Sequence, residues 1–327
     1  MAAKYRAAGF NLYIGLWQGP TEDQLATLKR EGMPVICEQN AVGLRHRDDP
    51  IIAGWMHGDE PDNAQEVTNP QTGKKEWGPC IPPAKVVDEY TKMKAADPSR
   101  PVMLNLGQGV ANDAWYGRGN GAKLDDYATY VKGSDLVSFD VYPVAGLGKP
   151  DQLGLVGKGI DRLKGWTGGK QTIWNCLECT RIGGQGKATP AQVRAEAWSA
   201  IIHGSRGLIY FVHQFEPKFD EHALLDDPEM LAAVTSLNAQ IQQYAPLLRA
   251  PASDRVSLAD SAADLAFASV RKGKASYAFL VSLVDRSVVA NLKFAGQHPR
   301  VTDVVGKSGP DGKVDLAPYE LHIIRFE

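Results

Sequence analysis

Short apolar runs alternate with amphipathic segments over the first 250 residues of the chain. Seven of these runs have the length and the Val, Ile and Leu content of buried strands, and polar or turn residues bound each of them. They cover residues 10–17, 33–40, 51–56, 100–106, 135–143, 171–178 and 207–214. Nearly continuous apolar strands joined by helical segments are typical of a parallel sheet covered by helices.

The segments between these strands carry helix start and stop signals. Thr21 and Gln24 have the spacing of a capping box, and so do Thr189 and Gln192, with Pro190 at the first helical position. Further helices are expected over residues 83–96, 124–132, 150–166 and 228–249. The order strand, helix, strand, helix therefore predicts an α/β fold.

A helix over residues 2–8, with Gly9 as its stop, precedes the first of the seven strands. We therefore expect an eighth strand upstream, which would complete a (β/α)8 TIM-type barrel over residues 1–250. The first strand would be missing or atypical, and a second copy could pair with the incomplete barrel edge. The main rival, an open doubly wound sheet, should carry a Gly-rich phosphate turn after its first strand, and residues 17–21 do not form one.

The pattern changes from residue 251 onward. Short alternating segments over 264–270, 276–284, 288–294, 300–305 and 319–326 are separated by turn residues, as at Pro310-Asp-Gly-Lys313. This spacing predicts a small antiparallel, β-sandwich-like domain over residues 251–327.

Composition narrows the class of partner. The 327 residues carry a net charge of -2, so no basic surface for nucleic acid is indicated. No apolar run reaches the roughly 18 residues of a membrane span, and the N-terminus lacks the apolar core of a signal peptide. Localisation stays open: an upstream export signal would make the protein secreted or periplasmic, and otherwise it would be cytoplasmic.

The cysteines and histidines give no clear metal or redox pattern. Cys176 and Cys179 form a Cys-x-x-Cys pair, but it lies within a predicted strand, so buried thiols are expected. Histidines and aspartates that could form a metal site lack tight ligand spacing; they are His57, His213, His222, Asp59 and Asp220. No cofactor or metal is therefore expected.

The best candidates for chemistry are carboxylates at strand ends. Glu60 follows an apolar strand that Pro61 stops, and Glu178 ends the strand over 171–178. Other interpretations remain open. Glu60 could be a surface carboxylate in a turn, Glu178 could pair with Arg181, and Glu38 could take the place of Glu178.

Three sequence features resemble those of the clan A glycoside hydrolases. They are Gly58-Asp-Glu-Pro61, Asp140-Val-Tyr-Pro143 and Glu178. Counting the expected upstream strand, Glu60 ends strand four and Glu178 ends strand seven, where that group carries its acid/base and its nucleophile. The resemblance implies retaining hydrolysis of a β-linked oligo- or polysaccharide, with Tyr142 steadying Glu178. Asp59 departs from the pattern, because many members have Asn there. Asp140 would be a structural hydrogen-bond acceptor rather than a catalyst.

Candidate sugar contacts lie at or near strand ends. They are Trp17, Gln39, His57, Asp59, Asn105, Trp115, Tyr142, Trp174, His213 and Gln214. Each has an ordinary alternative, because aromatic rings also fill cores and buried polar groups are often satisfied within a fold. Two other functions remain open: a carbohydrate-binding protein without turnover on the same scaffold, and a metal-dependent hydrolase.

Overall fold

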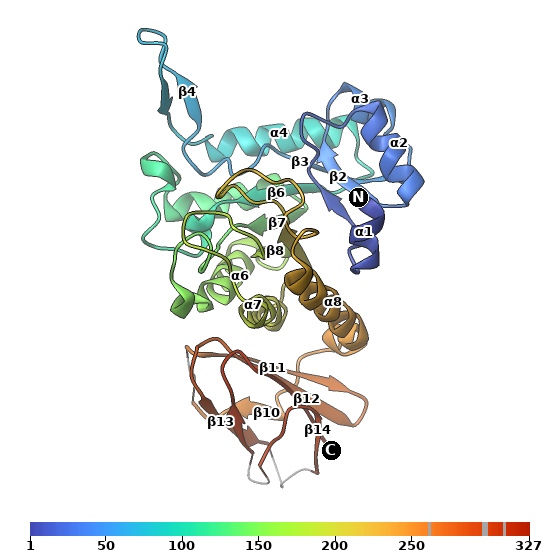
Figure 1. Ribbon diagram of the computed structural model, residues 1–327, viewed down its shortest axis with the longest axis vertical. Coiled ribbons are helices and arrows are strands. Elements are labelled where there is room, and N and C mark those ends of the chain that lie inside the picture. The colour runs from blue at the N-terminus through green and yellow to red at the C-terminus, as the bar shows by residue number, and fades with distance from the viewer. Residues whose placement is uncertain (261–262, 296–299, 310–311) are drawn as a thin grey trace. The chain divides into compact units, whose positions relative to one another are not determined.

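The computed structural model describes residues 1–260, 263–295, 300–309 and 312–327, and Figure 1 shows its helices and strands. The chain divides into two compact units, which are described separately. Unit 1 comprises residues 1–141 and 159–176, and unit 2 comprises residues 142–158 and 177–327. The expected turn at Pro310 and Asp311 lies outside the described residues.

A parallel sheet forms in the first three quarters of the chain, and seven strands belong to it among the described residues. In sheet order they are β1 (Tyr13–Ile14), β2 (Val35–Glu38), β3 (Ile52–Met56), β6 (Val102–Leu106), β7 (Leu136–Phe139), β8 (Thr172–Glu178) and β9 (Gly207–Phe211). Each corresponds to one predicted apolar run. The first is shorter than predicted, because Gly15 turns the backbone at a φ of 74°.

Helices precede, separate and follow the strands of this sheet. They are α1 (Ala2–Ala7), α2 (Glu22–Glu31), α3 (Ala41–Arg45), α4 (Pro83–Ala96), α5 (Tyr127–Tyr130), α6 (Gly154–Thr167), α7 (Pro190–His203) and α8 (Pro228–Leu248). Both predicted capping boxes form, with Thr21 accepting from the Gln24 amide and Thr189 from the Gln192 amide. In the described parts of the chain, no helix is both long and apolar enough to cross a bilayer. The fold is a (β/α)8-type barrel followed by a small antiparallel β domain.

Residues 62–83 of unit 1 contain a hairpin that the sequence pattern did not predict. Strands β4 (Glu66–Thr68) and β5 (Lys75–Trp77) pair antiparallel, and this hairpin extends outward at the top of Figure 1. All six of its strand residues are exposed, so it lacks the alternation of apolar and polar positions that marks a half-buried strand.

The C-terminal strands of unit 2 form two antiparallel sheets. One has the order β10 (Val256–Leu258), β13 (Val288–Phe294), β15 (Lys313–Leu316); the other has the order β11 (Leu265–Lys272), β12 (Ala275–Ser282), β16 (Leu321–Phe326), β14 (Val301–Val305). Leu280, Leu292, Val314 and Ile324 belong to a shared apolar core. The two strands absent from the prediction, β10 and β15, have only three and four residues. The predicted boundary at residue 250 stays a prediction, although every antiparallel strand of this domain follows it.

Helix α7 holds the antiparallel domain within unit 2. The Trp198 ring stacks on Phe279 of β12, with centroids 6.0 Å apart, and its indole N–H donates to Gln240 Oε1 of α8 at 3.0 Å. Trp198 is fully buried. One helix of the barrel and one face of the C-terminal domain therefore share a core.

Candidate functional site

Glu60 lies in unit 1, just beyond the carboxyl end of β3. The backbone is held to the next strand, because the His57 amide donates to Met103 O at 3.0 Å and the Glu60 amide donates to Asn105 O at 3.2 Å. Glu60 adopts a φ of 43°, which is rare for a residue with a side chain. Such strain is held in place by surrounding structure and clusters at functional sites.

The environment of the Glu60 carboxyl favours its protonated form. Burial, followed by the charges of Asp140, Asp59 and Asp62, raises the pKa of Glu60 to about 8. A hydrogen bond from Asn63 Nδ2 to Glu60 Oε2, 2.6 Å long, acts in the opposite direction. Glu60 is therefore largely a neutral acid at pH 7, as a general acid must be.

Asn105 on β6 connects Asp140 and Asp59, the two aspartates whose charges raise the pKa of Glu60 the most. Its Nδ2 donates to Asp59 Oδ1 at 2.8 Å and to Asp140 Oδ1 at 3.0 Å. Its carbonyl oxygen accepts from Ser138 Oγ at 2.6 Å, which fixes the orientation of the amide. The predicted residues Asp59 and Asn105 thus lie together beside Glu60, and Asp140 joins them.

Two further residues contact Glu60 and were not predicted. Asn63 accepts from Trp115 Nε1 at 2.8 Å while its amide donates to Glu60, so the indole and the carboxyl are linked through one side chain. Arg118 Nη2 lies 3.3 Å from Glu60 Oε2, and its guanidinium lies 4.8 Å from the centre of the Trp77 ring. Asn63 could have been found from its spacing of three residues after Glu60. Arg118 could not, because it reaches the site from a distant loop.

Glu178 lies in unit 2 at the end of β8, and it has no exposed surface. Its Oε1 accepts from the Val144 amide at 2.8 Å, and its Oε2 accepts from the Ala145 amide. In the described part of the chain it forms no ion pair with Arg181, so that alternative interpretation is wrong. Charge-assisted bonds from two backbone amides stabilise an ionised carboxylate.

A second carboxyl, Glu196 of α7, lies against Glu178. It too is fully buried, and burial followed by the neighbouring charge of Glu178 raises its pKa well above the ordinary value. Burial also raises the pKa of Glu178, while Glu196 and the two amides act to lower it. We infer that Glu196 carries the shared proton and donates it to Glu178 in a hydrogen bond, because two buried carboxylates in contact cannot both be charged. Nothing in the local sequence around Glu196 indicates this role.

Two predicted sugar contacts of unit 1 bond to the main chain instead. Gln39 Nε2 donates to Met93 O at 3.0 Å. The buried His57 ring lies 2.8 Å from Gly133 O through its Nε2, and burial lowers its pKa. Both side chains therefore have structural partners. Trp17, by contrast, is 83% exposed and remains a candidate for stacking.

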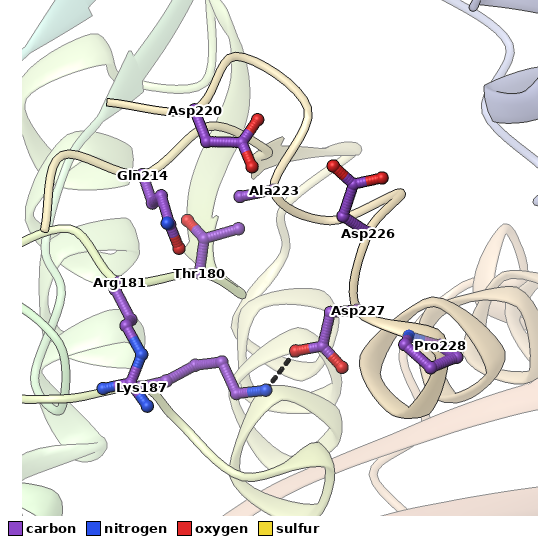
Figure 2. A pocket seen from close by; sticks show the side chains of 9 residues that line it. All are labelled: Thr180, Arg181, Lys187, Gln214, Asp220, Ala223, Asp226, Asp227 and Pro228. Carbon is purple, nitrogen blue, oxygen red and sulfur yellow. Dashed lines mark hydrogen bonds and ion pairs between the residues drawn. The ribbon is translucent and has the colours of Figure 1, made fainter. Parts of the chain in front are cut away.

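The remaining predicted contacts belong to β8 and to unit 2. Trp174 on β8 is half-buried. The Tyr142 ring meets Phe211 edge-on with centroids 5.5 Å apart, and Phe211 meets the His213 ring at 4.0 Å. Gln214 lines a polar cavity (Figure 2). Tyr142 and His213 thus share an aromatic cluster next to the loop whose amides bind Glu178.

The cysteines are free thiols, and Cys176 and Cys179 are both buried. Burial raises the pKa of each thiol, so neither is an activated nucleophile. Among the residues that the structure describes, no three His, Cys, Asp or Glu side chains are grouped so that they could hold a metal ion.

Comparison with known proteins identifies relatives of the fold. No protein-family profile matches the chain, and no curated protein matches it in sequence. An α-amylase from Geobacillus thermoleovorans, in complex with acarbose, superposes with a TM-score of 0.55 at 12% identity, covering 99% of this chain and 90% of that one. AmyP in complex with maltose gives 0.54 at 9% identity, covering 99% and 88%.

A cold-adapted β-galactosidase from Rahnella sp. R3 gives a TM-score of 0.50 at 13% identity, over 75% of this chain and 53% of that one. The chain shares a barrel fold with these three proteins. At these identities the likeness extends to the fold alone. The predicted resemblance to barrel glycoside hydrolases is confirmed at that level.

Proposed function

We propose that this protein is a glycoside hydrolase in which Glu60 is the general acid. The observation that carries the proposal is a carboxyl at the end of a barrel strand whose pKa is raised to about 8 by burial and by neighbouring aspartates. A glycosidase requires such a group to protonate the leaving oxygen. The named activities of the proteins that share the fold support the same class of substrate.

We assign the second carboxyl to Glu178, as nucleophile of a retaining reaction on a β-linked oligo- or polysaccharide. Glu60 donates its proton to the leaving oxygen while Glu178 attacks the anomeric carbon and the glycosidic bond breaks. Glu60 then removes a proton from a water molecule, which attacks the anomeric carbon and displaces Glu178. Burial raises the pKa of Glu178, and two backbone amides and the Glu196 proton act against this effect by stabilising the ionised form. The assignment requires that the buried Glu178 carboxylate become accessible when a saccharide binds.

Asp140 is the alternative second carboxyl. It is half-buried, it is fixed by Asn105, and its charge has the largest electrostatic effect on Glu60. Stereochemistry and mutation distinguish the two assignments. Proton NMR of the first product anomer identifies retention or inversion. If Glu178 is the nucleophile, Glu178→Ala abolishes turnover. Added azide then restores turnover and gives a glycosyl azide of the anomeric configuration opposite to that of the substrate. The same rescue in Asp140→Ala would transfer the role to Asp140.

The proposal is tested by comparing good and poor leaving groups. A panel of α- and β-linked nitrophenyl glycosides and soluble glucans first identifies the substrate and the linkage. Glu60→Gln should then lose about 10²- to 10⁴-fold in kcat on an oligosaccharide, and far less on a dinitrophenyl glycoside, whose leaving group needs no proton. Equal activity of Glu60→Gln and wild type on the oligosaccharide would remove Glu60 from the mechanism. If no glycan in the panel releases reducing ends but saccharides bind, the protein is a carbohydrate-binding protein.

A further inference from the structure

Unit 2 contains a cavity of about 350 Å³, shown in Figure 2, to which no role has yet been given. Its walls come from the loop after β8 and the loop after β9, which include Arg181 and Asp220 respectively. Ligands of parallel α/β folds bind at the carboxyl ends of the strands. The volume lies in the lower part of the range for small-molecule sites.

A short hairpin positions one wall of the cavity. Gln214 and Asp220 exchange two backbone hydrogen bonds, 2.9 and 3.1 Å long. Because side chains alternate across a strand, Phe215 and Phe219 point to the other face of this hairpin, where their rings pack with His213. The hairpin therefore has an aromatic face and a polar face, and the polar face lines the cavity.

Several polar groups of the cavity are already fixed by bonds within the protein. Asp220 Oδ1 accepts from the His222 amide at 2.8 Å, so the carboxylate is held in place. The Thr180 hydroxyl donates to His213 O at 2.6 Å, which leaves its oxygen able to accept from a ligand. A site built from groups held in this way loses little entropy when it binds.

The charges that remain for a ligand are unequal. Lys187 and Asp227 form an ion pair with each other, as the dashed line in Figure 2 marks, so their charges cancel. Arg181 then contributes one positive charge, and Asp220 and Asp226 contribute two negative charges. The cavity thus offers hydrogen-bond donors on the Arg181 side and carboxylate acceptors on the other, with a net charge of about -1 from simple side-chain charges.

We propose that this cavity binds one neutral sugar unit through Asp220, Asp226 and Arg181, and that it excludes uronic acids. Sugar hydroxyls both donate and accept, so adjacent hydroxyls can donate to the carboxylates and accept from the guanidinium and the Gln214 amide. Ala223 supplies apolar surface for the C–H face of a sugar ring. A carboxylate on the ligand would meet a cavity whose net charge is about -1, and like charges in proximity disfavour binding.

This inference deepens the proposed function and rests on its saccharide substrate, but its test does not require turnover. Binding of glucose, galactose, mannose and xylose to the Glu60→Gln protein is measured by saturation-transfer NMR, alongside glucuronate and galacturonate. At least one neutral sugar should bind at least tenfold more tightly than its uronate. Asp220→Asn, which keeps the acceptor for the His222 amide, should weaken neutral-sugar binding about tenfold.

Asp226→Asn should narrow the gap between glucose and glucuronate, because it removes one of the two opposing charges. Asp151→Asn, an exposed position in unit 2, is the matched control and should bind as the parent does. Any one of three results would overturn the proposal. None of the four neutral sugars binds, a uronate binds as tightly as its neutral sugar, or Asp220→Asn retains full affinity. If sugar binding depends on Asp220 but the protein cleaves no glycan, the sugar site in the cavity is supported and the proposed hydrolase activity is refuted. If the protein cleaves a glycan but Asp220→Asn binds sugars as the parent does, the hydrolase activity is supported and the sugar site in the cavity is refuted.

Discussion

Asp59→Asn provides a direct perturbation of the Glu60 environment. Asp59 is an exposed neighbour whose charge raises the pKa of Glu60, after burial and Asp140. Removing that charge makes ionisation of Glu60 easier, so its pKa must fall. The substituted amide keeps an oxygen for Asn105 Nδ2, now 2.8 Å from Asp59 Oδ1, and its new N–H₂ group can face water.

The shift should be about one pKa unit, equivalent to about 1.4 kcal/mol, because solvent near an exposed carboxylate screens its charge. The assay is the pH dependence of kcat/KM, whose alkaline limb reports the essential acid of the free enzyme. We expect that limb to move from near pH 8 toward pH 7 in Asp59→Asn, while Asp23→Asn, an exposed position on α2, leaves it in place. An alkaline limb that stays at the wild-type position or moves upward would refute the electrostatic account of Glu60.

Three predictions concern stability. The raised pKa of Glu196 means that the folded chain holds its proton more tightly than the unfolded chain, so this stabilisation is complete below about pH 4.5 and is lost as pH rises. Urea unfolding should show wild type losing stability relative to Glu196→Gln as the pH is raised above 4.5, and parallel curves would contradict the shared proton. Trp198→Ala removes the stack on Phe279 and should lower the free energy of unfolding, measured by calorimetry, by about 3–5 kcal/mol. A loss below about 1 kcal/mol would show that the ring is not part of the core. Thr189→Ala should cost about 1 kcal/mol through the lost cap of α7, whereas Thr189→Ser should retain most of it, and equal losses in both variants would argue against the cap.

Much of the barrel follows from local pattern. Each of the seven predicted apolar runs became a strand of the parallel sheet. The signature is clearest for β6 and β7, which are buried at every position. Both capping boxes formed because a cap depends on residues only three positions apart. The β4–β5 hairpin was missed for the opposite reason, since its strands are exposed on all sides and bury no apolar face.

The candidate site was predictable only in part. A carboxylate after an apolar strand identified Glu60, with Asp59 directly before it in the sequence, and Asn105 was predicted as a sugar contact from its place near a strand end. Contacts between residues far apart in the sequence leave no local pattern. Arg118, for example, contacts Glu60 from 58 positions away in the chain. The burial of Glu178 could not be predicted either, because the sequence places this residue at a strand end but does not show that α7 brings Glu196 against it.

The proposed function depends most directly on Glu60 holding a proton at neutral pH. The direct measurement is a ¹³C NMR titration of glutamate-labelled protein, with the Glu60 carboxyl resonance assigned by its absence in Glu60→Gln. We expect a midpoint near pH 8 for that resonance. A midpoint near 4.5, the ordinary value for glutamate, would contradict it and would leave Glu60 unable to act as the acid at neutral pH.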